Sequence, residues 1–163
     1  MIVRYLFRIA DKGTIVKATD KLKLDCYVDA DVAGLYCCEP DENPTSVKSR
    51  TGYIILLGGF PLVWKSQLQT EISLSTLESE YSALSQSMRT LLHLRRTLLE
   101  TAQRIALPSI LLKTFACRVF EDNNGALLLA TGQRITSRTK YFLVKWRFFW
   151  SGELEVLKVD TKE

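Results

Sequence analysis

The sequence predicts a mixed α/β fold, because three patterns agree. Apolar and polar residues alternate over residues 21–31, as in a strand with one buried face. A long helical repeat of apolar residues follows a hairpin-like segment, and strand and helix patterns then alternate to the end of the chain. This order of elements is typical of a mixed α/β sheet. A chain of 163 residues, 47% hydrophobic and 25% charged, can bury a core as one domain, which excludes collagen-like and disordered classes.

The first part of the chain contains a short helix, a strand and a hairpin. Residues 1–12 show a helical pattern that ends at Asp11-Lys12-Gly13. Alternate residues of the strand 21–31 are apolar, and its opposite face becomes acidic toward the end. Strands expected over 51–57 and 62–65 form a hairpin, with the turn at residues 58–61.

The strongest helix signal lies in the middle of the chain. Ser75-Thr76-Leu77-Glu78 fits a capping box, and apolar residues then recur every three or four positions until the pattern fades near Gln103. On a helical wheel with Leu77 as reference, Glu80 falls at about 300°, at the edge of the apolar stripe, whereas Glu78 falls at about 100°. Glu80 is therefore the helix acid that we expect to face the sheet.

The last third of the chain predicts four further elements. These are a strand over 110–121, a short helix over 123–130, a helix over 140–150 and a final strand over 153–159.

Charge and cysteine content indicate a general class of protein. The chain has 22 basic and 18 acidic residues, a net charge of +4, which mildly favours anionic partners. Its four cysteines show no zinc-binding spacing, and isolated thiols suit a reducing compartment. Arg4 and Arg8 interrupt the apolar N-terminus, which makes it a poor signal peptide, and no apolar run is long enough to span a bilayer. We expect an intracellular protein, in the cytoplasm or nucleus, with no membrane partner.

Three acidic residues lie at strand ends or on the inner side of the helix. Asp29 is near the end of the first strand, Glu80 is on the helix, and Asp122 directly follows the strand 110–121. Carboxylates that meet at one point repel each other unless protonated or neutralised by a cation, and hard oxygen ligands favour Mg²⁺ or Mn²⁺. Two such ions about 4 Å apart can clamp the attacking water and the leaving oxygen of a phosphodiester. The alternative is that these acids are simply solvated.

Five motifs follow one another along the chain. They are residues 24–34 (LDCYVDADVAG), 49–53 with 64–66 (SRTGY and WKS), 74–84 (LSTLESEYSAL), 121–126 (EDNNGA) and 137–140 (SRTK). In sequence and in order they resemble the ribonuclease H domain of copia-type retrotransposon polyproteins. Residues 1–13 resemble the last helix of the reverse transcriptase region that precedes that domain.

The resemblance implies a ribonuclease H-like fold, with a mixed five-stranded sheet flanked by helices. It implies two-metal hydrolysis, with Mg²⁺ or Mn²⁺, of the RNA strand of an RNA–DNA hybrid. By motif match, Asp29, Glu80 and Asp122 are both the metal ligands and the catalytic residues. Residues 1–20 would be a remnant of the reverse transcriptase C-terminal helix and linker, and residues 21–163 the ribonuclease H-like domain. The rest of a reverse transcriptase polyprotein is a candidate partner.

The family pattern is incomplete at the C-terminal end. The family's fourth acid lies in a Leu-Ala-Asp segment after the last strand, and this chain ends just before it, as a C-terminally truncated copy would. The nearest acid, Asp160, is either a substitute ligand or a solvated terminal residue. The alternative function is therefore a catalytically impaired relic that at most binds nucleic acid. An integrase-like nuclease of the same fold is disfavoured by the helix motif around Glu80.

Candidate nucleic-acid contacts follow the third acid. No acidic residue lies between Asp122 and Glu153, and within this stretch Arg138 and Lys140 are expected to contact phosphates. Aromatic residues of the same stretch either stack on nucleotides or fill the core. By resemblance, Asn123 donates to the nucleic-acid backbone, and capping of the following helix is an equal alternative.

Overall fold

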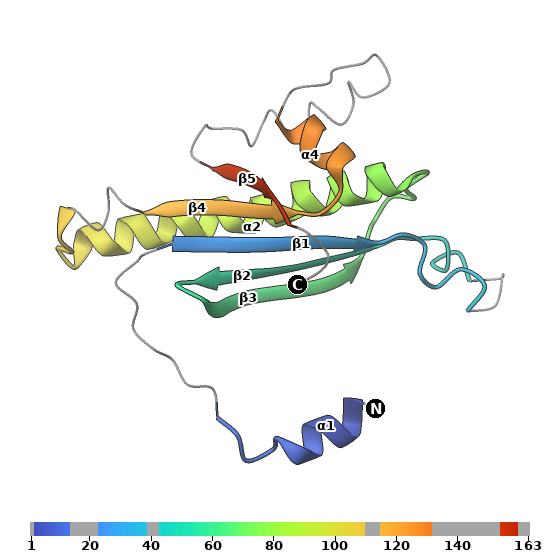
Figure 1. Ribbon diagram of the computed structural model, residues 1–163, viewed down its shortest axis with the longest axis horizontal. Helices are drawn as coiled ribbons and strands as arrows, with labels where there is room; N and C mark the ends of the chain where they lie inside the picture. Colours follow the sequence, from blue (N-terminus) through green and yellow to red (C-terminus); the bar gives the residue numbers. More distant parts are fainter. Residues whose placement is uncertain (1, 14–22, 39–42, 110–114, 132–153, 160–163) are drawn as a thin grey trace.

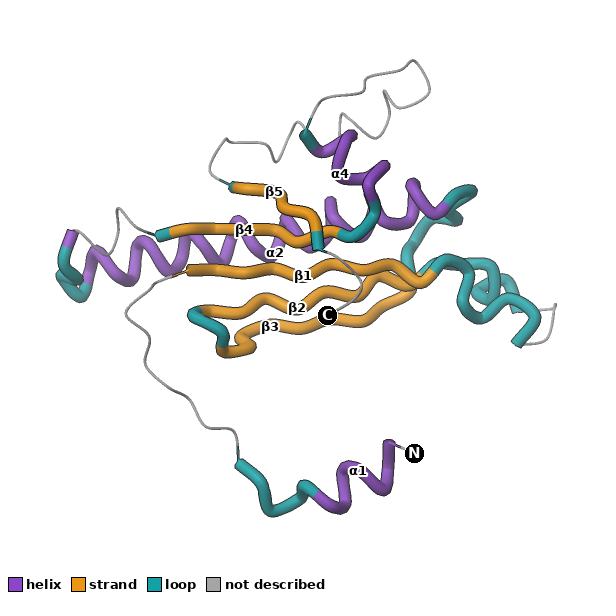
Figure 2. The backbone as a smooth tube through the Cα atoms, in the orientation of Figure 1, coloured by secondary structure: helices purple, strands orange, loops and turns teal. Residues whose placement is uncertain are grey.

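The computed structural model describes residues 2–13, 23–38, 43–109, 115–131 and 154–159. Five strands form one sheet, in which β1 pairs antiparallel with β2, β2 pairs antiparallel with β3, and β4 runs parallel to both β1 and β5. The order across the sheet, visible in Figures 1 and 2, is β3 (Phe60–Leu68), β2 (Arg50–Leu57), β1 (Lys23–Asp31), β4 (Ala116–Glu121), β5 (Glu155–Lys158). The expected mixed five-stranded sheet is confirmed.

The core lies between the sheet and α2 (Thr76–Arg104), a 29-residue helix that packs across β1 and β2 (Figure 1). Alternate residues of β1 point toward α2 and are buried, as the period of two predicts. The helix contributes apolar side chains at helical spacing. The buried residues from the two elements are Leu24, Cys26, Val28, Ala30, Tyr81, Leu84, Met88 and Leu91.

The hairpin between β2 and β3 has a tighter turn than the sequence suggested. Gly58 and Gly59 have φ values of 58° and 89°, and glycine adopts this left-handed backbone without a steric cost. Two residues therefore complete the turn, and Phe60 and Pro61 already belong to β3. Pro61 is accommodated because β3 is an edge strand and the pairing register shifts beside it, after Ile55.

The start of α2 has the expected capping interactions. Ser75 Oγ accepts a hydrogen bond from the Glu78 backbone N–H at 3.2 Å. Glu78 Oε2 in turn accepts one from the Leu74 N–H at 2.8 Å. The first contact satisfies a backbone donor that the first helical turn leaves free, whereas the second satisfies the N–H of Leu74, one residue before the N-cap. They also place the Glu78 carboxylate before the helix start, separate from Glu80.

The sheet face opposite α2 carries a polar and aromatic contact between two parallel strands. Arg118 on β4 donates two hydrogen bonds, of 2.7 and 2.8 Å, to the buried carboxylate of Asp25 on β1. The rings of Tyr27 and Phe120 stack with centroids 4.6 Å apart. Both contacts connect β1 with β4, whose ends carry two of the three predicted site residues.

The remaining elements agree with the sequence predictions in type. α4 (Asn124–Ala130) follows β4, and α1 (Ile2–Arg8) lies apart from the sheet in Figure 1. β4 begins at Ala116, later than expected, and the helix predicted over 140–150 lies outside the described residues. Among the helices that the structure describes, none is both long and apolar enough to cross a membrane.

Candidate metal centre

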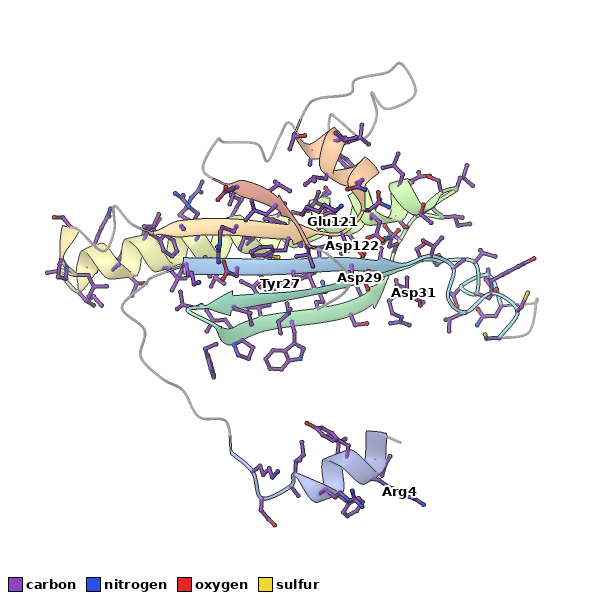
Figure 3. All side chains as sticks on the ribbon, viewed as in Figure 1. Arg4, Tyr27, Asp29, Asp31, Glu121 and Asp122 are labelled. Atoms are coloured by element: carbon purple, nitrogen blue, oxygen red, sulfur yellow. The ribbon has the colours of Figure 1, made fainter. Side chains whose placement is uncertain are left out.

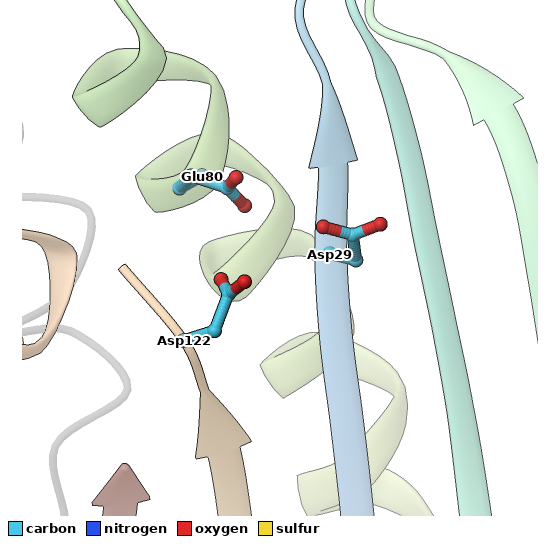
Figure 4. Close-up of side chains that lie close together, drawn as sticks. All are labelled: Asp29, Glu80 and Asp122. Carbon is cyan, nitrogen blue, oxygen red and sulfur yellow. The ribbon is translucent and has the colours of Figure 1, made fainter. Parts of the chain in front are cut away.

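The three predicted acids meet at the carboxyl ends of two neighbouring strands in the middle of the sheet. β1 and β4 are parallel neighbours, so their carboxyl ends lie together, with Asp29 near the end of β1 and Asp122 directly after β4. Glu80 reaches the same point from the beginning of α2. One carboxylate oxygen of each residue lies within 4.8 Å of those of the other two (Figure 4). The geometry therefore brings together the residues that helix-wheel and strand-end arguments selected.

The centre is open on one side and buried on the other. Asp29 is exposed, Asp122 is half-buried, and Glu80 retains only 7% of its accessible surface. Asp29 therefore lies on the solvent side of the group, and Glu80 lies on its buried side.

The charge state of Glu80 reflects this position. Burial, followed by the negative charges of Asp29 and Asp122, raises the pKa of Glu80 from 4.5 to about 7. A backbone hydrogen bond from Ala30 opposes the rise. Because a nearby cation favours the ionised carboxylate, metal binding would lower this pKa again.

A fourth acid, Glu121, lies beside the centre and was not predicted from the sequence. It is fully buried, and burial raises its pKa to about 8, with Glu80 the next largest cause. Figure 3 shows it next to Asp122 at the end of β4. A signal was available, because alternation along β4 places Glu121 on the same inward face as Cys117 and Val119.

The site fits a hard divalent cation. Three carboxylates supply only oxygen ligands, the set that Mg²⁺ and Mn²⁺ prefer. In the described part of the chain, Glu80 Oε2 and Glu121 Oε2 are buried without a hydrogen-bond partner. Buried polar atoms are rarely left unsatisfied, and a cation would satisfy them electrostatically.

Asn123 acts in the structure as a helix cap. Its side-chain oxygen accepts hydrogen bonds from the N–H groups of Gly125 and Ala126, at 2.9 and 3.1 Å. This fixes the chain direction immediately after Asp122. The other two predicted nucleic-acid contacts, Arg138 and Lys140, lie outside the described residues.

Comparison with known proteins agrees with the expected family. The chain is 31% identical over 168 residues to the retrovirus-related Pol polyprotein from transposon TNT 1-94 of Nicotiana tabacum, a match that covers 99% of this chain and 11% of the relative. It is 28% identical over 166 residues to that from transposon RE2 of Arabidopsis thaliana, covering 99% of this chain and 10% of the relative. These relatives, which match over 99% of the chain, are retrovirus-related Pol polyproteins from transposons. The chain spans about a tenth of the length of these curated relatives. No protein-family model matches it.

The fold comparison agrees with this homology. A ribonuclease H1 isolated from compost, LC11, superposes with a TM-score of 0.60, covering 86% of each chain at 15% identity. The chain therefore has a ribonuclease H-like fold, as its motifs predicted.

Proposed function

We propose that the chain is a metal-dependent ribonuclease H that hydrolyses the RNA strand of RNA–DNA hybrids. The observation that carries the proposal is the convergence of Asp29, Glu80 and Asp122 within 4.8 Å at the carboxyl end of two parallel strands. The ribonuclease H-like fold and the Pol homologues support the same reaction class. We further propose that residues 1–20 are a reverse transcriptase remnant and that residues 21–163 form the nuclease domain.

Each acid has a distinct part in this proposal. Asp29, which is exposed, and Asp122, which is half-buried, border the open side that the phosphodiester approaches. Glu80 holds the ion from the buried side, and its carboxylate accepts a hydrogen bond from the Ala30 backbone N–H, which ties α2 to β1 at this point. Bound Mg²⁺ or Mn²⁺ would supply an activated water and neutralise charge on the phosphate. The capped turn after Asp122 fixes that carboxylate relative to the other two.

A second function, binding of hybrid without cleavage, applies if no fourth acid joins the three that meet at the centre in the described residues. By resemblance, the family has a fourth acid in a Leu-Ala-Asp segment after the last strand. Loss of one ligand from a metal site lowers both affinity and rate. The same fold would then retain hybrid binding that weakens with salt and is indifferent to Mg²⁺.

Cleavage of a labelled RNA–DNA hybrid in Mg²⁺ and in Mn²⁺ tests the proposal. Asp29→Asn should abolish cleavage, whereas Asp31→Asn, an equal change of charge at an exposed residue outside the cluster, should retain it. Duplex DNA and single-stranded RNA serve as substrate controls. If the wild-type protein binds the hybrid but cleaves it neither in Mg²⁺ nor in Mn²⁺, the second function is supported and the first is contradicted.

A further inference from the structure

Glu121 has no evident role in the packing of the core. It is the last residue of β4 and follows Cys117 and Val119 on the strand face that points toward α2. Both of these residues are buried and neither has a carboxyl group, whereas Glu121 places a carboxyl group on the same face with no exposed surface. Burial of an ionisable group costs free energy that an apolar side chain of similar size would not.

The hydrogen bonds of Glu121 satisfy only one of its two oxygens. Oε1 accepts from the Asn123 backbone N–H at 3.2 Å. Oε2 is buried and has no hydrogen-bond partner among the described residues. The charges that act on this carboxyl group are those of Glu80, Asp122 and Asp29, all of them acidic. A carboxylate that interacts electrostatically with three others is stabilised when a cation binds among them.

We propose that Glu121 is a fourth carboxylate of the metal centre, which lies behind Asp29, Glu80 and Asp122 and strengthens cation binding through its negative charge. Glu121 is outside the group of acids whose oxygens lie within 4.8 Å of one another, so it acts on the cation from behind that group. This inference rests on the proposed function, because it requires that the three acids hold a divalent cation.

Manganese binding to the full chain, measured by calorimetry, tests this role without reference to activity. Glu121→Gln preserves the shape of the side chain and an oxygen acceptor for the Asn123 N–H, but removes the charge. We expect at least a tenfold weaker affinity for Mn²⁺, the effect typical of residues that support metal ligands. Glu100→Gln, the same substitution at an exposed residue of α2, should bind within about twofold of wild type.

A second variant separates charge from shape. Glu121→Asp retains the negative charge on a shorter side chain and should recover part of the lost affinity. Equal binding by wild type and Glu121→Gln would overturn the inference, as would Glu121→Asp binding no better than Glu121→Gln. Circular dichroism of the metal-free variants checks that each is folded.

The same experiment distinguishes failure of this inference from failure of the proposed function. If wild type binds Mn²⁺ and Asp29→Asn abolishes binding, the three-acid centre stands, and an unaffected Glu121→Gln contradicts only the role of Glu121. If wild type binds no Mn²⁺, both the proposed function and this inference are refuted.

Discussion

The metal-free protein is predicted to lose stability as the pH rises, and Glu80→Gln should remove much of that loss. Burial and the charges of Asp29 and Asp122 raise the pKa of Glu80 from 4.5 to about 7. A raised pKa means that the folded state holds the proton more tightly, so this contribution to stability is complete below pH 4.5 and is lost as the pH rises through 7. A shift of this size corresponds to about 3 kcal/mol. Wild type should therefore lose about 3 kcal/mol relative to Glu80→Gln over this pH range.

Urea unfolding in EDTA at about pH 4.5 and about pH 8.5 measures this difference. Glu80→Gln also removes the charge that raises the pKa of Glu121, so that secondary effect has the same sign. Glu100→Gln, an exposed control on the same helix, should leave the difference from wild type constant with pH. The reasoning is wrong if the stability of Glu80→Gln relative to wild type stays constant or falls as the pH increases.

Divalent metal should reverse the penalty in wild type. At the higher pH, Mg²⁺ at about a hundred times its dissociation constant adds about 3 kcal/mol to the free energy of unfolding. Glu80→Gln lacks one of the three ligands and should gain much less. A metal-induced rise in stability that is equal in the two proteins would place the binding site elsewhere.

Three further predictions concern the scaffold of the centre. Arg118→Met removes two hydrogen bonds from the buried Asp25 carboxylate and should cost roughly 2–3 kcal/mol in urea unfolding, with much of the loss recovered when Asp25→Leu is added. Ser75→Ala removes the cap of α2 and should cost about 1 kcal/mol, whereas Ser75→Asp should remain within a few tenths of wild type. Leu84→Ala leaves a cavity beneath β1 and should lower the free energy of unfolding by about 3 kcal/mol, and a loss under 1 kcal/mol would contradict the packing described.

Local patterns predicted much of the fold and singled out the three acids as candidates, whereas the family resemblance assigned them to a metal site. The period of two in β1 correctly indicated which of its residues face the core. The helical wheel placed Glu80 toward the sheet and Glu78 away from it, and the structure confirms both positions. These predictions succeeded because strand and helix geometry fix side-chain direction once the element is known.

Features that depend on pairing between distant strands were not predictable in the same way. The contact of Asp25 with Arg118 joins residues 93 positions apart and requires the register between β1 and β4, which no local pattern specifies. The hairpin turn is shorter than the predicted residues 58–61, because Pro61 is tolerated in β3, and that tolerance depends on the position of β3 at the edge of the sheet. Glu121 is a different case, because alternation along β4 is a local pattern and was enough to indicate that this residue is buried.

The most direct test of the metal centre is the anomalous diffraction of Mn²⁺ in crystals of the chain. We expect manganese peaks within about 2.5 Å of carboxylate oxygens of Asp29, Glu80 and Asp122, and their loss in crystals of Asp29→Asn. Manganese bound elsewhere, or no peak among the three acids at saturating Mn²⁺, would contradict the claim that these residues form a metal centre.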